Sequence, residues 1–370
     1  MRVLVVNAGS SSLKLTLLGG DDTTIATREL EAPRAQVDPK TLREALRDGL
    51  GEADVVGHRI VHGGERFREA VAIDAGVEQE LRALVELAPL HQPKSLAALD
   101  AVSEALPGLP AVACFDTAFH ATMPAAAATY AIPREWRERW GLRRYGFHGL
   151  SHAWVARRAP ELLQRDARGL RIVSCHLGAG ASLCAIADGA SLDTTMGFTP
   201  LEGLVMATRS GSVDPGMMLW LLEHGQLSGG ELADALEHRS GLLGLAGSAD
   251  MREIVARAGM PGRSEAGQLA RLGLDVYVHR LRAGIAAMAA ALGGVDALAF
   301  TGGVGERSAA VRERAAAGLS FLGVQLDGAR NDAAHGDAEI GADGAAARAL
   351  VLTAREDIEI ARQVRTLLAD

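Results

Sequence analysis

The sequence is poor in cysteine and has no surplus of basic charge. Its three cysteines (Cys114, Cys175 and Cys184) all lie in apolar runs, which predicts buried free thiols in a reducing compartment rather than a disulfide framework. Acidic residues outnumber basic ones by 46 to 38, which gives a net charge of −8. This balance excludes the basic field typical of proteins that bind nucleic acid or anionic membranes. An anionic ligand must therefore be held by local cations.

Long apolar segments are also missing. The N-terminal run, residues 2–6, meets polar residues at once, so the core of a signal peptide is not expected. The longest apolar run, residues 283–295, is shorter than the roughly 20 residues that cross a bilayer. We therefore expect a cytoplasmic protein without a membrane or nucleic-acid partner.

Lysine and asparagine are scarce, and two nucleotide motifs are absent. The chain has only three lysines (Lys14, Lys40 and Lys94) and two asparagines (Asn7 and Asn331), while arginine supplies most of the basic residues. No Gly-Lys pair occurs, which excludes a P-loop, and no complete G-x-G-x-x-G occurs either. A lysine or asparagine inside a motif is therefore informative.

Glycine, by contrast, is abundant, with 43 residues in a chain of 370. At about 150 residues per domain, this length predicts two domains. Small and glycine-rich turns are expected at 7–12, 176–182 and 301–306, each at the end of an apolar strand. The first two turns each lie between two strands, so the plan of residues 2–18 is repeated in the second half. Such a repeat indicates duplicated domains.

Apolar periodicity predicts the remaining elements and an α/β fold. Strands are expected at 55–61, 111–115, 297–300 and 349–352, and helices at 78–87, 215–224, 230–238, 251–258, 264–292 and 308–317, with a closing helix at the C-terminus. Open α/β sheets bind ligands at the carboxyl ends of their strands, and backbone N–H groups in small turns suit phosphate. The alternative is that these glycines only satisfy the geometry of tight turns.

Seven segments carry a family resemblance. They are 3–14 (VLVVNAGSSSLK), 58–65 (HRIVHGGE), 114–120 (CFDTAFH), 144–152 (RYGFHGLSH), 193–211 (DTTMGFTPLEGLVMATRSG), 300–306 (FTGGVGE) and 354–357 (ARED). In this order, over the whole chain, they resemble the acetate kinase family.

The resemblance implies a duplicated actin/hexokinase-like (ribonuclease H-like) fold with an interdomain nucleotide cleft. Residues 1–120 with 358–370 would form the N-terminal domain, and 121–357 the domain for nucleotide binding and dimerisation. The implied activity is reversible transfer of a phosphoryl group from ATP to acetate, giving acetyl phosphate and ADP. The implied cofactor is Mg²⁺, with Mn²⁺ able to substitute, and the implied assembly is a homodimer.

The resemblance also assigns a catalytic set: Arg59, Asp116, His148 and Arg209. Read alone, an arginine is usually a solvated surface group, but guanidinium forks suit the oxygens of a transferring phosphoryl group. Arg59 is further expected to hold the acetate carboxylate. The family treats Asp116 as a proton donor or acceptor. Because acetate is already ionised at neutral pH, we favour Asp116 as an orienter of Arg59 or of metal-bound water.

Magnesium positions carry over to Asn7 and Glu356, and Lys14 becomes a phosphate contact. One amide oxygen and one carboxylate suit Mg²⁺, which keeps waters and phosphate oxygens as its other ligands. His148 and His152 are four residues apart and would share one face of a helix. A zinc pair is the rival interpretation, but no third ligand is near in sequence, so capping or core roles are preferred.

Nucleotide contacts are implied at three segments: His176, Leu177, Gly178, Ala179 and Gly180; Asp250, Met251 and Arg252; and Gly303, Val304, Gly305, Glu306 and Arg307. The chain departs from the family pattern at Ala179 and Arg307, where asparagine is usual, and at Ala207, where glycine is usual. These changes bear on nucleotide affinity and purine preference.

The acyl pocket implied by the resemblance comprises Val61, Leu90, Phe147 and Pro200, with His91 and His120 near the site or simply packing. A small apolar pocket discriminates one methylene by only about 1–3 kcal/mol, so propionate or butyrate kinase stays open as an alternative. A second alternative is a nucleotide-dependent sensor or chaperone of the same fold. Such a protein should lack the two arginines, which this chain keeps.

Overall fold

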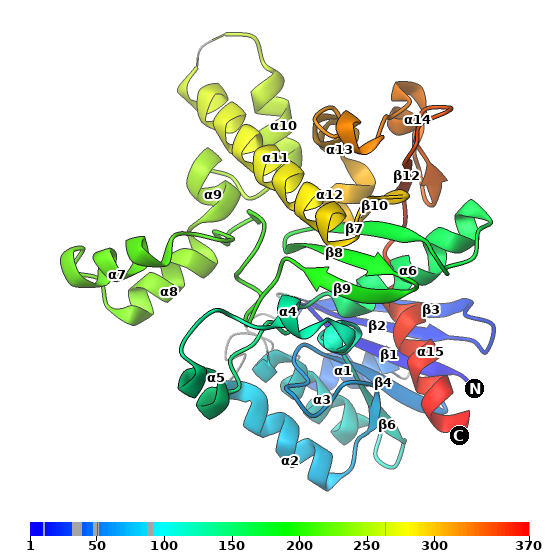
Figure 1. Ribbon diagram of the computed structural model, residues 1–370. Helices are drawn as coiled ribbons and strands as arrows, with labels where there is room; N and C mark the ends of the chain where they lie inside the picture. The colour runs from blue at the N-terminus through cyan, green and yellow to red at the C-terminus, as the bar shows by residue number, and fades with distance from the viewer. Residues whose placement is uncertain are drawn as a thin grey trace. The chain divides into compact units, whose positions relative to one another are not determined.

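The chain folds into two compact α/β units (Figure 1). The computed structural model describes residues 1–9, 12–31, 39–46, 50, 52–86, 92–262 and 264–369. The first unit consists of Met1–Ala121, Phe147–Trp154 and Arg355–Asp370, and the second of Thr122–Gly146 and Val155–Ala354. Each unit has its own six-stranded sheet within the described ranges.

The sheet of the first unit has the order β3-β2-β1-β4-β6-β5. Its strands are β1 (Val3–Ala8), β2 (Ser12–Leu18), β3 (Thr24–Glu31), β4 (Val55–Ile60), β5 (Val71–Ala72) and β6 (Ala111–Phe115). Strands β1, β2 and β3 pair antiparallel, whereas β1, β4 and β6 run parallel. The predicted hairpin and the strands expected at 55–61 and 111–115 are confirmed.

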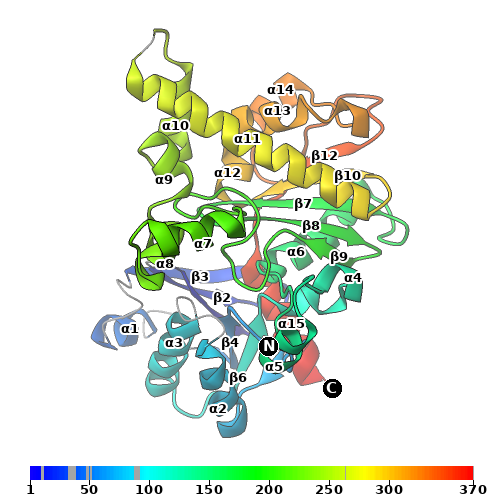
Figure 2. The same ribbon diagram turned by 60° about the vertical axis from the view of Figure 1, so that its left-hand side comes forward.

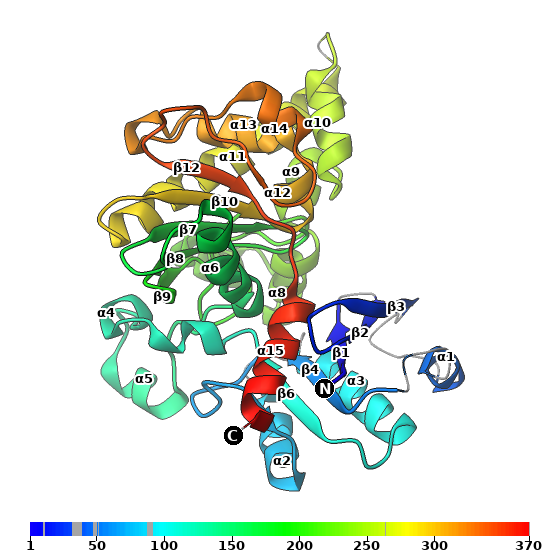
Figure 3. The same cartoon turned by 90° about the vertical axis from the view of Figure 1, so that its right-hand side faces the viewer.

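Helices cover both faces of this sheet. They are α1 (Pro39–Ala45), α2 (Ala75–Ala83), α3 (Gln92–Ala105), α15 (Glu356–Ala369) and the beginning of α6 (Gly149–Leu163). On one face Leu4 and Val6 pack with α1 and α3, and on the other Val3 and Val5 pack with α15 and α6. Figure 3 shows α15 beside β1 and β4. Alternating apolar residues along β1 therefore supply two separate cores.

The helix expected at 78–87 is placed differently. It begins at Ala75, because the Asp74 side chain accepts a hydrogen bond from the backbone N–H of Val77 and caps it. It ends at Ala83 and is followed by a 3₁₀ turn over Leu84–Glu86. The cap, rather than apolar periodicity, sets the start of this helix.

The sheet of the second unit has the same strand arrangement as the sheet of the first unit. Its order is β11-β12-β10-β7-β8-β9, with β7 (Arg171–Leu177), β8 (Ala181–Ala187), β9 (Ala190–Thr194), β10 (Ala297–Thr301), β11 (Ala338–Glu339) and β12 (Arg348–Val351). The antiparallel triplet β7, β8 and β9 corresponds to β1, β2 and β3, and β7, β10 and β12 run parallel. The duplication predicted from the two hairpins is confirmed.

The helices of the second unit include the one long helix that the sequence predicted at 264–292. They are α4 (Ala125–Ala128), α5 (Arg134–Trp140), the rest of α6, α7 (Pro215–His224), α8 (Gly229–His238), α9 (Gly241–Ala246), α10 (Met251–Gly259), α11 (Glu265–Ala291), α12 (Gly302–Arg307), α13 (Ala309–Ala316) and α14 (Gly328–Ala333). Helix α11 runs across strands β7, β8 and β9 (Figure 2).

One predicted turn is a helix. Residues 301–306 were expected as a glycine-rich turn, but α12 follows β10 directly. Gly302 makes the sharp change of direction with φ 77°, where a Cβ would lie 2.8 Å from the carbonyl oxygen of Leu177. The last carbonyls of α12, at Gly305 and Glu306, accept hydrogen bonds from the Arg312 guanidinium. These contacts support a helix that its composition disfavours.

All three cysteines are buried and none forms a disulfide, as predicted, and burial raises the pKa of each thiol. Among the described helices, none combines the length and apolar character needed to cross a bilayer.

Candidate functional site

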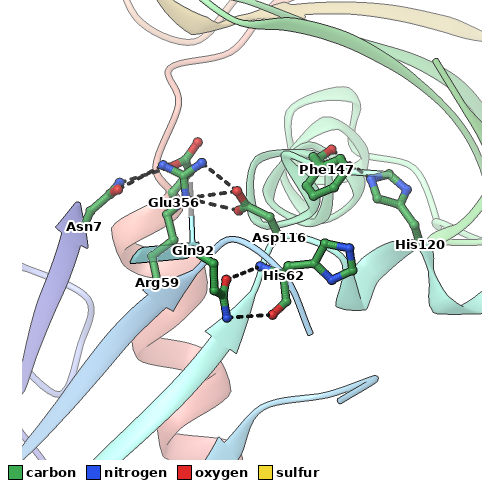
Figure 4. Close-up of polar contacts among 8 residues, drawn as sticks. All are labelled: Asn7, Arg59, His62, Gln92, Asp116, His120, Phe147 and Glu356. Carbon is green, nitrogen blue, oxygen red and sulfur yellow. Dashed lines mark hydrogen bonds and ion pairs between the residues drawn. The ribbon is translucent and has the colours of Figure 1, made fainter. Parts of the chain in front are cut away.

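Arg59 and Asp116 form the centre of a polar cluster in the first unit (Figure 4). They lie at the carboxyl ends of the neighbouring parallel strands β4 and β6. Arg59 Nε donates to both carboxylate oxygens of Asp116 at 3.1 Å, and Nη2 donates to Oδ2 at 2.6 Å. Asp116 is 1% exposed. The contact is a buried, multiply hydrogen-bonded ion pair that fixes the guanidinium.

Asn7 and Glu356 meet the other side of the same guanidinium. Arg59 Nη1 donates to Asn7 Oδ1 at 3.0 Å and lies 3.7 Å from Glu356 Oε2. Asn7 Nδ2 donates in turn to Glu356 Oε2 at 3.1 Å. Asn7 comes from β1 and Glu356 is the first residue of α15. Four predicted site residues, far apart in sequence, are thus brought together.

The electrostatics keep this guanidinium charged. Burial lowers the pKa of Arg59, but the carboxylates of Asp116 and Glu356 outweigh it, and the pKa is raised. Burial raises the pKa of Asp116, while Arg59 opposes that shift. Both carboxylate oxygens of Asp116 accept hydrogen bonds from Arg59.

The donor set suits a hard divalent cation. The amide oxygen of Asn7 and the carboxylate of Glu356 both lie next to the Arg59 guanidinium. Mg²⁺ takes few protein oxygens and completes its ligands with water and phosphate. In the part of the chain that the structure describes, no group of three or more His, Cys, Asp or Glu side chains could hold a metal. Asn7 and Glu356 therefore fit Mg²⁺ better than a soft metal.

His62 and Gln92 are two buried polar residues drawn with this cluster in Figure 4, and neither was predicted as a site residue from the sequence. His62 is fully buried, accepts a hydrogen bond from the Gly64 N–H through Nδ1 at 2.8 Å, and is joined through its backbone to the Gln92 amide at 3.2 and 3.3 Å. Its ring meets Phe147 edge-on at 5.5 Å. His120 Nε2 lies 3.0 Å from the Phe147 carbonyl oxygen. Two signals pointed to His62: its position at the end of a predicted strand and its place in segment 58–65.

The other residues predicted for the acyl pocket belong to different parts of the chain. Val61 directly follows β4, beside Arg59, and Pro200 is a buried residue of the second unit. Leu90 and His91 lie outside the described residues.

His148 stands immediately before α6, not on it. Its backbone has φ 56°, a left-handed conformation, so His148 and His152 do not share a helical face. The next residue, Gly149, donates its N–H to the Asp116 carbonyl at 2.8 Å, which ties this segment to the end of β6. Lys14, on β2, is exposed and pairs in register with Asn7.

The second unit contains a cavity of about 760 Å³, within the range of small-molecule sites. Its lining includes eight residues predicted to bind nucleotide: Gly178, Ala179, Asp250, Met251, Arg252, Gly303, Val304 and Arg307. Six others do not line it: Lys14, His176, Leu177, Gly180, Gly305 and Glu306. Ala207, where the sequence departs from the family pattern, also lines the cavity.

Several lining residues were not anticipated. They are Leu242, Ala249, Val255, Tyr277, Ser308, Ala309 and Ala310. Leu242 and Tyr277 are buried residues of α9 and α11, and such apolar positions in a helix indicate only a core when read from sequence. The cavity is thus largely apolar, with charged side chains from α10 and α12.

Asp250 and Arg252 form a fixed pair at the start of α10. Asp250 caps the helix by accepting from the Arg252 N–H at 2.8 Å, and the Arg252 side chain donates back to it at 2.6 to 3.2 Å. These hydrogen bonds lower the pKa of Asp250 to about 2. Arg307 is exposed at the end of α12.

Arg209 lies in the second unit, in the segment between β9 and α7. Its Nε is 3.0 Å from Glu237 Oε2, and its Nη1 is 3.5 Å from the Pro200 carbonyl oxygen. Burial lowers the pKa of Arg209, and Glu237 opposes the shift. Glu237, on α8, was not anticipated, because an acidic residue on an amphipathic helix is usually solvated.

Comparison with known proteins identifies the family. The acetokinase family profile matches residues 24–362. The chain belongs to the acetokinase family. It is 42% identical to an acetate kinase of Nostoc punctiforme over 409 aligned residues, covering all of both chains, and 43% identical to one of Gloeobacter violaceus, covering 98% of both. As an acetokinase-family member it is a kinase.

Solved structures agree with the fold. A Porphyromonas gingivalis acetate kinase matches with a TM-score of 0.88 and 36% identity over 99% of both chains. A Francisella tularensis propionate kinase matches with the same TM-score and 33% identity over 98% of both. The duplicated two-domain α/β architecture is therefore that of the acetokinase family.

Proposed function

We propose that this acetokinase-family chain transfers the γ-phosphoryl group of ATP reversibly to acetate, giving acetyl phosphate and ADP. The observation that carries the proposal is the Arg59 guanidinium, which is buried against Asp116 and bordered by Asn7 and Glu356. Such a fixed fork suits a carboxylate acceptor and the oxygens of a phosphoryl group.

The acceptor needs no general base. Acetate has a carboxyl pKa near 4 and is ionised at neutral pH. One of its oxygens attacks the γ-phosphorus, the bond to the β–γ bridging oxygen breaks, and ADP leaves. Arg59 orients the acceptor, and Asp116 holds Arg59. Positioning and charge stabilisation therefore supply the catalysis.

Arg209 and His148 complete the proposed catalytic set. Arg209 stabilises charge on the transferring phosphoryl group, and His148 donates a hydrogen bond to it. The left-handed backbone at His148 is a rare conformation for a residue with a side chain. Such local strain is common at functional positions.

Asn7 and Glu356 would hold Mg²⁺, which neutralises charge on the phosphate oxygens when bound. Lys14 is proposed as a phosphate contact. The cavity of the second unit would hold the nucleotide. The base would lie against the apolar lining, and the polar groups of the nucleotide near the charged side chains of Asp250, Arg252 and Arg307. Nucleotide binding is accordingly assigned to the second domain.

The acyl group is proposed to lie against Phe147, Val61, Leu90 and Pro200. The His62 ring meets the Phe147 ring edge-on, and His120 contacts the Phe147 backbone carbonyl. Because a solved relative is a propionate kinase, propionate is the main competing acceptor.

The deciding experiment traps acyl phosphate as its hydroxamate, with ATP, Mg²⁺ and acetate, propionate or butyrate in parallel. We expect the highest kcat/KM with acetate. A higher value with propionate would reassign the acceptor, and no product from any acid would refute the kinase activity.

A second measurement tests the role of Arg209. Arg209→Ala should lower kcat far more than it raises the KM for ATP, because the interaction is made in the transition state. The reverse pattern would make Arg209 a residue that only binds nucleotide.

The proposed assembly is a cytoplasmic homodimer. Helix α7 supports it, because none of its residues is buried and several large apolar side chains are exposed: Met217, Leu219, Trp220 and Leu222. A second copy of the chain would cover them. Sedimentation equilibrium of the wild type and of Leu219→Glu tests this, and a wild-type monomer would contradict it.

A further inference from the structure

The loop that carries Arg209, residues 206–211, is bonded along its length to the end of α8 and the start of α9. We call it the Arg209 loop. The Ser210 N–H donates to the Leu236 carbonyl at 3.0 Å, and the Thr208 carbonyl accepts from the Ser240 N–H at 2.9 Å. The main chain of the loop is therefore held by the corner between α8 and α9.

The corner approaches the loop closely. Gly241, the first residue of α9, has φ 61°, and a Cβ there would lie 2.3 Å from the Met206 carbonyl oxygen and 2.6 Å from that of Arg209. The N–H of Leu242 donates to the same Met206 carbonyl at 2.9 Å. A side chain at position 241 would push the loop away.

Glu237 is a buried acidic residue of this corner. It is 8% exposed, and its Oε2 lies 3.0 Å from Arg209 Nε. Its backbone carbonyl also accepts a hydrogen bond from the Thr208 hydroxyl at 2.8 Å. Glu237 thus contacts the Arg209 loop through both its main chain and its side chain.

A buried carboxylate is costly unless it is paired, and a buried ion pair seldom adds net stability over an apolar pair. The pair is better explained by what it does to the arginine. Arginine has a long side chain with many rotamers. A contact at Nε fixes the direction in which the planar guanidinium points. Fixing the fork in advance favours a group that must meet a transition state.

We propose that Glu237 is the positioning residue for Arg209, holding its guanidinium in the direction that phosphoryl transfer requires. This inference rests on the proposed function. Glu237 acts through Arg209 and does not itself touch the reacting atoms.

Steady-state kinetics of Glu237→Gln and Glu237→Ala test the proposal. The matched control is Asp234→Asn, which removes a carboxylate of the same helix that pairs with Arg239 at the surface. We expect kcat to fall about tenfold in Glu237→Gln and further in Glu237→Ala, since small misplacements of a catalytic group are costly. The KM for ATP should stay within about twofold, and the control should match the wild type.

A second readout does not depend on turnover. The Nε–H resonance of Arg209, assigned by its disappearance in Arg209→Lys, should be distinct and slow to exchange in the wild type. In Glu237→Ala it should move to the position of exposed arginines and exchange faster. If the wild type makes no acyl phosphate from any acid, the proposed function fails, while this measurement still tests whether Glu237 holds Arg209.

Three results would overturn the inference. One is an unchanged or increased kcat in Glu237→Gln, and another is a loss confined to the KM for ATP. The third is an Nε–H resonance of Arg209 that is the same with and without the Glu237 carboxylate.

Discussion

At the scale of single residues, each proposed catalytic arginine is held by one buried carboxylate. Asp116 holds Arg59 in the first unit, and Glu237 holds Arg209 in the second. Asp116 directly follows a buried strand, so its position was readable from the sequence. Glu237 lies on a helix whose acidic residues look solvated. An isolated sequence does not say which of them turns inward.

Asp116→Asn tests whether this carboxylate orients Arg59. The amide keeps the shape but loses the charge, so the guanidinium should be less firmly fixed. We expect kcat to fall by about 100-fold or more, with circular dichroism unchanged. Asp100→Asn is the control, because that exposed carboxylate pairs with Arg82 at the surface. A near wild-type rate and Mg²⁺ affinity in Asp116→Asn would contradict the orienting role.

At the scale of elements, the hairpins and long helices were predictable, and short or atypical elements were not. Alternating apolar residues identified β1 and β2, and an amphipathic pattern identified α11. Helix α12 was mistaken for a turn because three of its six residues are glycine. Helix α6, which contains Pro160, was not among the predicted helices. Tyr277 was not anticipated in the cavity lining, because it lies within the long helix predicted at 264–292 and carries no motif of its own.

The start of α6 gives a prediction at this scale. A Cβ at Gly149 would lie 2.2 Å from the Asp116 carbonyl oxygen, so Gly149→Ala must displace the helix from β6. We expect a loss of about 1–3 kcal/mol in unfolding free energy and a lower kcat, measured by denaturant titration and by the hydroxamate assay. The control is Gly20→Ala, where the nearest atom is 3.6 Å away. Equal stability of the two variants would refute the close approach.

The buried guanidinium of Arg312 gives a second prediction at the scale of elements. Besides the α12 carbonyls, it donates to the side chain and backbone of Asn331 at 2.8 and 2.7 Å. Arg312→Met leaves these acceptors without a donor, and we expect a loss of about 2–4 kcal/mol. Arg314→Met, on the same helix and in a surface pair with Asp275, should change stability by no more than about 0.5 kcal/mol. Equal melting temperatures for the two variants would show that the hydrogen bonds of Arg312 do not stabilise the fold.

At the scale of the whole molecule, buried histidines make stability depend on pH. Burial lowers the pKa of His58 to about 3 from an ordinary value of 6.5. Between these values the unfolded chain binds a proton at His58 and the folded chain does not, so stability falls as pH falls through this window. The slope per proton is about 1.4 kcal/mol per pH unit.

His58→Gln should therefore flatten the pH dependence of unfolding between pH 4 and 6 relative to the wild type. Denaturant titrations at several pH values measure it, and His335→Gln, which changes an exposed histidine, is the control. A slope that stays the same in His58→Gln would show that His58 does not carry the effect.

The order of the segments along the chain has a consequence for synthesis on the ribosome. The first unit includes residues from both ends, and Val3 and Val5 of β1 pack against Ile360 and Val364 of α15. The longest segment of the second unit, Val155–Ala354, is complete before α15 is made. The N-terminal strands therefore emerge first yet finish their core last, and they must wait through nearly the whole of translation for the helix that covers them.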